Sequence, residues 1–135
     1  MKIRQLLTLL MGVGLLAVVF TPAAAGDGQH LYQIHCSRCH GIDGQGFRRL
    51  YPALQGSPYF NHKMMQLPCI ILYGLTGTIR LQNGTYNQTM PGNRLLNIEQ
   101  IVLLMGYTSR FSTEKSARAT MITPEEVEQQ LEQCR

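Results

Sequence analysis

The stretch Cys36-Ser37-Arg38-Cys39-His40 carries the strongest signal in this chain. In a helix, residues three and four positions apart are neighbours, so the two cysteines and the histidine would share one face. Asp27 can cap such a helix at its start, and Gly41 can end it in the left-handed conformation that glycine tolerates. We therefore expect a helix that ends in this motif, with Cys36, Cys39 and His40 side by side.

The pattern C-x-x-C-H is a specific signal for the covalent attachment of c-type haem. Two thiols on one face can add to the two vinyl groups of a haem while the imidazole reaches its iron. A thioredoxin-like C-x-x-C would need a βαβ context, and a structural zinc site would need a second ligand pair at close spacing. The chain shows no such pattern, so we predict one haem c bound covalently by Cys36 and Cys39, with His40 as an iron ligand.

The N-terminal segment predicts export. Lys2 and Arg4 precede an uncharged, mostly apolar run over residues 6–20, and three alanines follow at 23–25. These are the regions of a secretory signal peptide, and the run is shorter than the roughly 20 residues that span a bilayer. We expect a signal peptide at 1–25, a mature domain at 26–135 without a membrane span, and a periplasmic location. An uncleaved membrane anchor is the alternative.

The composition of residues 26–135 suits one small domain. Once Lys2 and Arg4 are set aside, ten basic and eight acidic residues remain, which gives a net charge of +2. No basic run with interleaved aromatic residues appears, so nucleic-acid binding has little support.

The remaining pattern predicts four more helices and no strands. Ser57-Pro58 and Pro68 can open two short helices, and Asn97 and Thr123 each begin a capping box. These signals place the helices at about 58–65, 68–74, 98–110 and 124–134. Residues 41–56 and 76–93 are rich in turn formers and read as loops. The expected fold is all-α, with about four to five helices and long loops, and residues 112–135 form a linker and an extra C-terminal helix.

Several segments resemble the class I (mono-haem) c-type cytochromes, of the small bacterial periplasmic type. The resemblance runs in order from Gly28 to Phe111 and rests on the CSRCH motif and on Tyr32, Y51-P-A-L-Q-G56, I70-I-L-Y-G-L-T-G77, Y86-N87, M90-P91 and the helix from Ile98 to Tyr107. It implies a cytochrome c-like fold wrapped around one haem. It also implies an electron-transfer protein rather than an enzyme, with redox donor and acceptor proteins as partners.

The resemblance further implies a methionine as the second axial ligand. Met90 is the best candidate, because it lies in a loop and precedes Pro91 as in the family. Met105 lies on a helix stripe typical of core packing, and Met64 and Met65 fall in a short helix near the attachment site. His30, His35 and His62 are interpreted as ordinary residues rather than ligands.

Other site residues also come from the resemblance. Pro52 lies twelve residues after His40, where the family has a proline whose carbonyl accepts a hydrogen bond from the ligand imidazole; a simple turn is the alternative. The haem wall would comprise Tyr51, Leu54, Leu75, Ile79 and Leu81, and the propionates could meet Tyr86, Asn87 or Arg80.

The chain departs from the family in two ways. Gln88 replaces a usual glycine and Arg94 a usual aromatic, which puts the shape of the Met90 loop in question. Cys69 and Cys134 have no family counterpart. Cys134 shares the apolar face of the last helix, so the pair could form a disulfide. Buried free thiols and a link to another chain remain alternatives.

Three functions are compatible with these features. The first is a periplasmic one-electron carrier with His40 and Met90 as axial ligands. The second is a dedicated cytochrome subunit of a dehydrogenase, nitrite-reducing or oxidase complex. The third is a gas-binding or peroxidatic haem protein, which would need a labile or absent methionine ligand. The sequence does not predict the oligomeric state.

Overall fold

The computed structural model describes residues 24–114 and 122–134. Of the expected signal peptide, only Ala24 and Ala25 belong to the described residues. Residues 115–121 of the expected linker, which include the methionine at position 121, also lie outside them. Within the described residues, no helix has the length and apolar character needed to cross a membrane.

The helices largely follow the capping signals. The structure contains α1 (Ala24–His35), α2 (Ser37–His40), α3 (Pro58–Asn61), α4 (Leu67–Tyr73), α5 (Ile98–Thr108) and α6 (Pro124–Gln133), with 3-10 turns η1 (Met64–Gln66) and η2 (Ser109–Phe111). Both expected capping boxes are present and confirm the starts of α5 and α6. The first helix begins before Asp27 and is interrupted at Cys36, and the expected helix at 58–65 is divided into α3 and η1.

The expectation of an all-α fold is wrong for residues 74–91. Strand β1 (Gly74–Leu75) pairs antiparallel with β4 (Met90–Pro91), and β2 (Ile79–Leu81) pairs with β3 (Gly84–Tyr86). Each strand has only two or three residues, too few to show the alternating pattern of a strand. The pairing satisfies backbone groups in a segment that would otherwise be an open loop.

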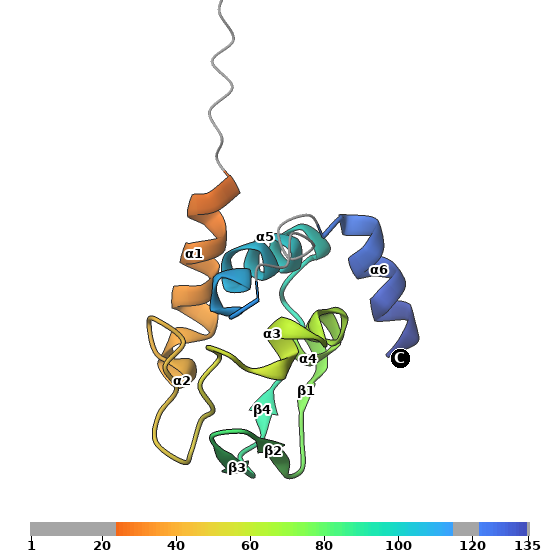
Figure 1. Cartoon of the computed structure of the whole chain (residues 1–135). Helices are drawn as coiled ribbons and strands as arrows, with labels where there is room; N and C mark the ends of the chain where they lie inside the picture. The colour runs from red at the N-terminus through yellow and green to blue at the C-terminus, as the bar shows by residue number, and fades with distance from the viewer. Residues whose placement is uncertain (1–23, 115–121, 135) are drawn as a thin grey trace, which may run out of the picture.

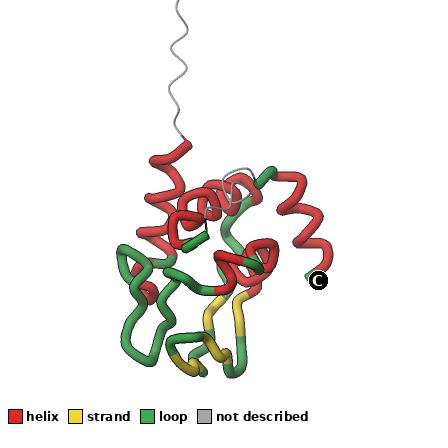
Figure 2. Tube along the Cα trace, viewed as in Figure 1, coloured by secondary structure: helices red, strands yellow, loops and turns green. Residues whose placement is uncertain are grey.

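The main core lies between α1 and α5, which pack against each other (Figure 1). The two helices approach closely at Gly28, where a side chain would collide with the backbone of Leu103 in α5. Tyr32 is fully buried, and its ring lies against those of Tyr107 and Phe111. In Figure 2 the loops and strands gather in the half of the molecule below this helix pair. They form the part of the protein in which the site lies.

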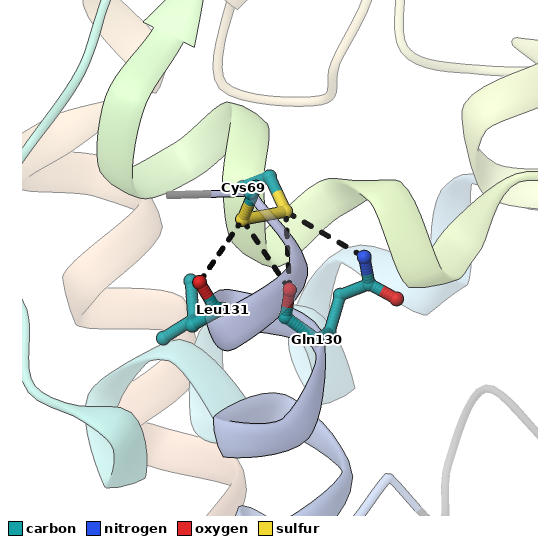
Figure 3. Close-up of a disulfide and its surroundings, with 4 residues drawn as sticks. Cys69, Gln130 and Leu131 are labelled. Atoms are coloured by element: carbon teal, nitrogen blue, oxygen red, sulfur yellow. Dashed lines mark hydrogen bonds between the residues drawn. A yellow bond between two sulfur atoms is a disulfide. The ribbon is translucent and has the colours of Figure 1, made fainter.

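The C-terminal helix α6 is docked on the domain rather than extended away from it. Val127 is fully buried and Leu131 nearly so, and both belong to the main core. Near the end of α6, Cys134 pairs with Cys69 of α4 in the structure (Figure 3). Helix α6 therefore contacts α4 through a sulfur pair and α5 through apolar packing.

Candidate functional site

The CSRCH motif begins where α1 ends. Hydrogen bonds from the backbone N–H groups of Cys36 to the Tyr32 carbonyl (2.9 Å) and of His40 to the Cys36 carbonyl (2.9 Å) keep the chain helical through the interruption. Cys36, Cys39 and His40 consequently line the same cavity, as the helical spacing predicts. Both cysteines are half-buried free thiols.

This cavity is large, mostly apolar and partly open to solvent. It has about 1220 Å³ of empty space, of which a part belongs to the open side. Its walls come from the motif, from the loop at 50–54, from α3 and α4, and from the strand region that includes Met90. Cavities lined by apolar side chains with a few convergent polar groups are typical cofactor sites.

The imidazole of His40 is oriented by a hydrogen bond at Nδ1, which leaves its other nitrogen, Nε2, available. Its Nδ1 lies 3.0 Å from the carbonyl oxygen of Pro52, and a carbonyl can only accept, so Nδ1 carries the ring proton. Burial lowers the pKa of His40 below its ordinary value, and the hydrogen bond to Pro52 opposes part of this shift. His40 is therefore a neutral imidazole whose Nε2 lone pair is available to bind a metal.

The thiol of Cys36 is held in its protonated form. Burial, together with the nearby Cys39, raises the pKa of Cys36 to about 11. Addition of a thiol across a vinyl group places the sulfur on one carbon and the proton on the other, so a protonated Cys36 carries both atoms that such a reaction uses.

The residues expected to wall a haem come together around this cavity. Its lining includes Pro52, Met90 and all five of the expected wall residues, namely Tyr51, Leu54, Leu75, Ile79 and Leu81. The five wall side chains are partly exposed, as expected for groups that face an open cavity. Of the polar residues considered for the propionates, Tyr86 lines the cavity, whereas Asn87 bonds to Thr78 (3.1 Å).

The other methionines are placed elsewhere. Of those that the structure describes, Met90 is the one that lines the cavity. Met64 and Met65 line a separate hollow beside Ile122, and Met105 is fully buried in the core.

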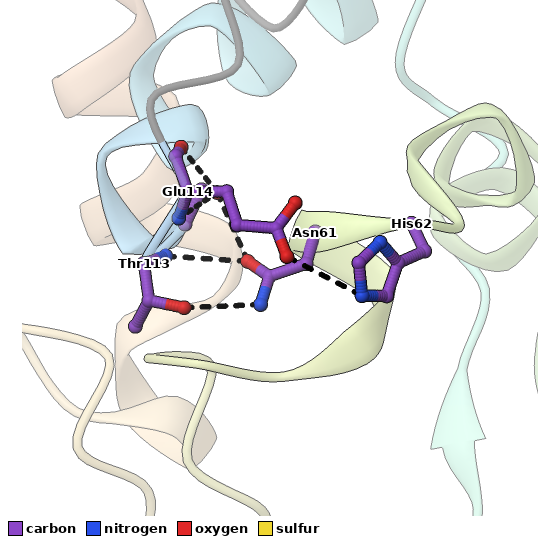
Figure 4. Close-up of polar contacts among 5 residues, drawn as sticks. Asn61, His62, Thr113 and Glu114 are labelled. Atoms are coloured by element: carbon purple, nitrogen blue, oxygen red, sulfur yellow. Dashed lines mark hydrogen bonds and ion pairs between the residues drawn. The ribbon is translucent and has the colours of Figure 1, made fainter.

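Of the three other histidines, two are placed away from the cavity. His30 is exposed on α1, and His62 lies at the surface, where its Nε2 is 3.4 Å from a Glu114 carboxylate oxygen (Figure 4). Beside that pair, Asn61 bonds to Thr113 (3.0 Å), which ties α3 to the residues after η2. His35 does line the cavity, which its interpretation as an ordinary residue of the first helix did not predict.

Further lining residues were missed from the sequence. Tyr59 and Phe60 of α3 and Leu67, Ile70 and Ile71 of α4 also face the cavity. Helices of four and seven residues are too short for hydrophobic periodicity to show which side faces a cavity.

Comparison with known proteins assigns the chain to a protein family. A family model described as cytochrome C oxidase, cbb3-type, subunit III matches residues 23–107, which is more than half of the chain. The chain belongs to this family of c-type cytochromes. The cytochrome is also similar to cytochrome c-552 of Thermus thermophilus, with 28% identity over 123 residues that cover 77% of this chain and 82% of the relative. Cytochromes c bind haem and transfer electrons, so membership of this family implies a haem-binding, electron-transferring protein.

The chemistry of the cavity fits the haem that the family implies. Its lining is mainly apolar, its two free thiols and the free Nε2 of His40 belong to one short segment, and a thioether is present on another wall. Each group that a covalently bound haem would need is thus supplied by residues of the same cavity.

Proposed function

We propose that this cytochrome is an exported one-electron carrier, with one haem attached covalently to Cys36 and Cys39 and ligated axially by His40 and Met90. The observation that carries the proposal is that Met90 lines the same cavity as the attachment motif, although it lies 50 positions after His40 in the sequence. A haem held by these residues would supply a ferric/ferrous couple, with which the protein could accept one electron from a donor protein and pass it to an acceptor protein.

The residues around the haem would set its reduction potential and the access of water and small molecules to it. The Pro52 carbonyl orients His40 and increases the basicity of its Nε2. The soft thioether of Met90 favours ferrous iron and so raises the reduction potential. The apolar wall keeps water from much of the site. If His40 and Met90 both bound the iron, no coordination site would remain open for a small molecule, and this would favour a carrier over a gas-binding or peroxidatic protein.

The Met90→Ala variant tests the ligand assignment. In the haem-loaded protein, the near-infrared sulfur-to-iron band should disappear, and the potential should fall by about 0.1 V or more, within the ~0.8 V range that axial ligands span. Met65→Ala is the matched control, because Met65 lines the separate hollow and should leave both measurements unchanged. A Met90→Ala protein that keeps its band would show that another residue is the ligand.

A second candidate is a dedicated subunit of an oxidase complex. It is favoured by the description of the matching family as a subunit of a cbb3-type oxidase. Purification of the tagged protein from a detergent extract of whole cells separates the two candidates. A subunit would co-purify with a membrane oxidase in fixed proportion, whereas a free carrier would be recovered alone.

Two structural details belong to the same proposal. We propose that residues 1–25 are removed on export to the periplasm, and that Cys69 and Cys134 are joined in the mature protein. The intact mass of the exported protein tests both, because it reports the N-terminus directly and rises by two hydrogens when a disulfide is reduced.

A further inference from the structure

We propose that a hydrogen bond between His35 and Asn93 holds the Met90 segment against the haem-attachment helix, so that these two residues position Met90 as an iron ligand. We call this pair the His35–Asn93 clasp. The proposal rests on the His40 and Met90 ligation proposed above and assigns a role to two residues that this ligation does not involve.

The hydrogen bonds of Asn93 determine the direction of the clasp. Nδ2 of Asn93 lies 3.1 Å from Nδ1 of His35, and Oδ1 of the same amide accepts from the backbone N–H of Leu95 (3.2 Å). A backbone N–H can only donate, so the amide oxygen faces Leu95 and the NH₂ group faces His35. His35 therefore accepts through Nδ1, and its ring proton is on Nε2.

The other side of the Met90 segment is held by backbone contacts. The N–H of Asn93 donates to the carbonyl of Ile71 in α4 (2.8 Å), and Leu75 of β1 is paired with Met90 of β4. At Gly92 the chain passes so close to the end of α4 that a side chain would collide with its backbone. The segment is thus fixed to α4 and β1 by its main chain, and the clasp connects it to α1.

The clasp acts on the ligation of iron by Met90 because it connects the chain segments on the two sides of the cavity. His35 precedes the attachment residue Cys36, and Asn93 follows Met90 by three positions. His35 and Met90 line the same cavity. The clasp therefore ties together the two chain segments that carry the thiol attachment and the thioether. The other contacts of this segment described above, together with the Arg94 guanidinium over the Tyr73 ring (5.4 Å), all lie on the side of α4 and β1, so the clasp adds a connection to the attachment helix.

The size of the effect follows from the strength of a single hydrogen bond. One neutral hydrogen bond in a folded protein changes an equilibrium by about two- to tenfold. Loss of the clasp should increase the population in which Met90 is detached from iron by this factor. His35 is exposed and Asn93 half-buried, so substitutions at either position leave the core intact.

The experiment uses four single variants and one double variant of the haem-loaded, exported protein. His35→Phe keeps a ring but removes the acceptor, Asn93→Ala removes the donor, and His35→Asn restores an acceptor oxygen near the position of Nδ1. His30→Phe is the control, because His30 is exposed on the same helix. The readouts are the rate of carbon monoxide binding to the reduced protein, which requires a detached Met90, and the near-infrared band of the oxidised protein.

We expect His35→Phe and Asn93→Ala to bind carbon monoxide about two- to tenfold faster, with a weaker near-infrared band. His35→Asn and His30→Phe should behave like the wild type. The double variant His35→Phe/Asn93→Ala should be no faster than the faster single variant, because both remove the same bond. The proposal is overturned if His35→Phe matches His30→Phe, or if the two single effects multiply in the double variant. If the wild type itself lacks the near-infrared band, the ligation by Met90 fails and the clasp proposal fails with it.

Discussion

Removal of the Cys69–Cys134 pair should destabilise the folded protein by an amount that the structure sets. We consider the double variant Cys69→Ser/Cys134→Ser in the haem-loaded protein. The two cysteines are 65 residues apart, and a cross-link that closes a loop of this length removes about 4 kcal/mol of conformational entropy from the unfolded chain. Residual structure in the unfolded state reduces such values, so we expect a loss of about 2–4 kcal/mol in the free energy of unfolding.

The assay is guanidinium or thermal unfolding followed by the helical circular dichroism signal. For a domain of this size the loss corresponds to a fall of roughly 8–16 °C in the melting temperature. Reduced wild-type protein is the control, because it lacks the cross-link but keeps both cysteine side chains, and it should melt close to the double variant. The reasoning is refuted if oxidised wild type, shown by mass to contain the disulfide, melts within about 1 °C of its reduced form.

Three further predictions concern other parts of the fold. Tyr32→Phe removes a buried hydroxyl that donates to the Gly41 carbonyl (2.6 Å), and should lower the free energy of unfolding by about 1 kcal/mol in urea titrations. Thr123→Ala removes the side-chain cap of α6 and should cost about 1 kcal/mol, whereas Thr123→Ser should restore most of it. Hydrogen bonds from its own backbone N–H and from Thr123 lower the pKa of Glu125 below 4.5, so its contribution to stability is present above that pH and is lost as the pH falls through its folded-state value. Glu125→Gln should therefore show a shallower loss of stability than the wild type between about pH 5 and pH 3.

The features that depend on neighbouring residues could be predicted from the sequence. The capping boxes at Asn97 and Thr123 require residues three positions apart, and both helices begin where these signals lie. The grouping of Cys36, Cys39 and His40 follows from helical spacing alone. The contact between His40 and Pro52 spans twelve residues, and it was expected through resemblance to a family rather than through any local pattern.

The features that depend on distant residues were not predictable in the same way. The pairing of β1 with β4 joins residues 74–75 to 90–91 through main-chain groups. Main-chain hydrogen bonds do not require particular side chains, so this pairing produces no recognisable sequence pattern. The clasp joins residues 58 positions apart, and a histidine and an asparagine are ordinary polar residues in isolation. The side chains of Ile70 and Ile71 are apolar whether they face a cavity or the core, so their hydrophobicity does not reveal which of the two they line.

The sulfur pair between α4 and α6 also bears on how the protein matures. Four cysteines in an oxidising compartment can combine into two disulfides in three ways, and in two of these the attachment thiols are linked to distant residues. Once Cys69 and Cys134 have paired, this chain holds no other thiol with which Cys36 or Cys39 could form a wrong disulfide. The C-terminal helix, which takes no part in the cavity, would in this way reserve the attachment thiols for haem during assembly.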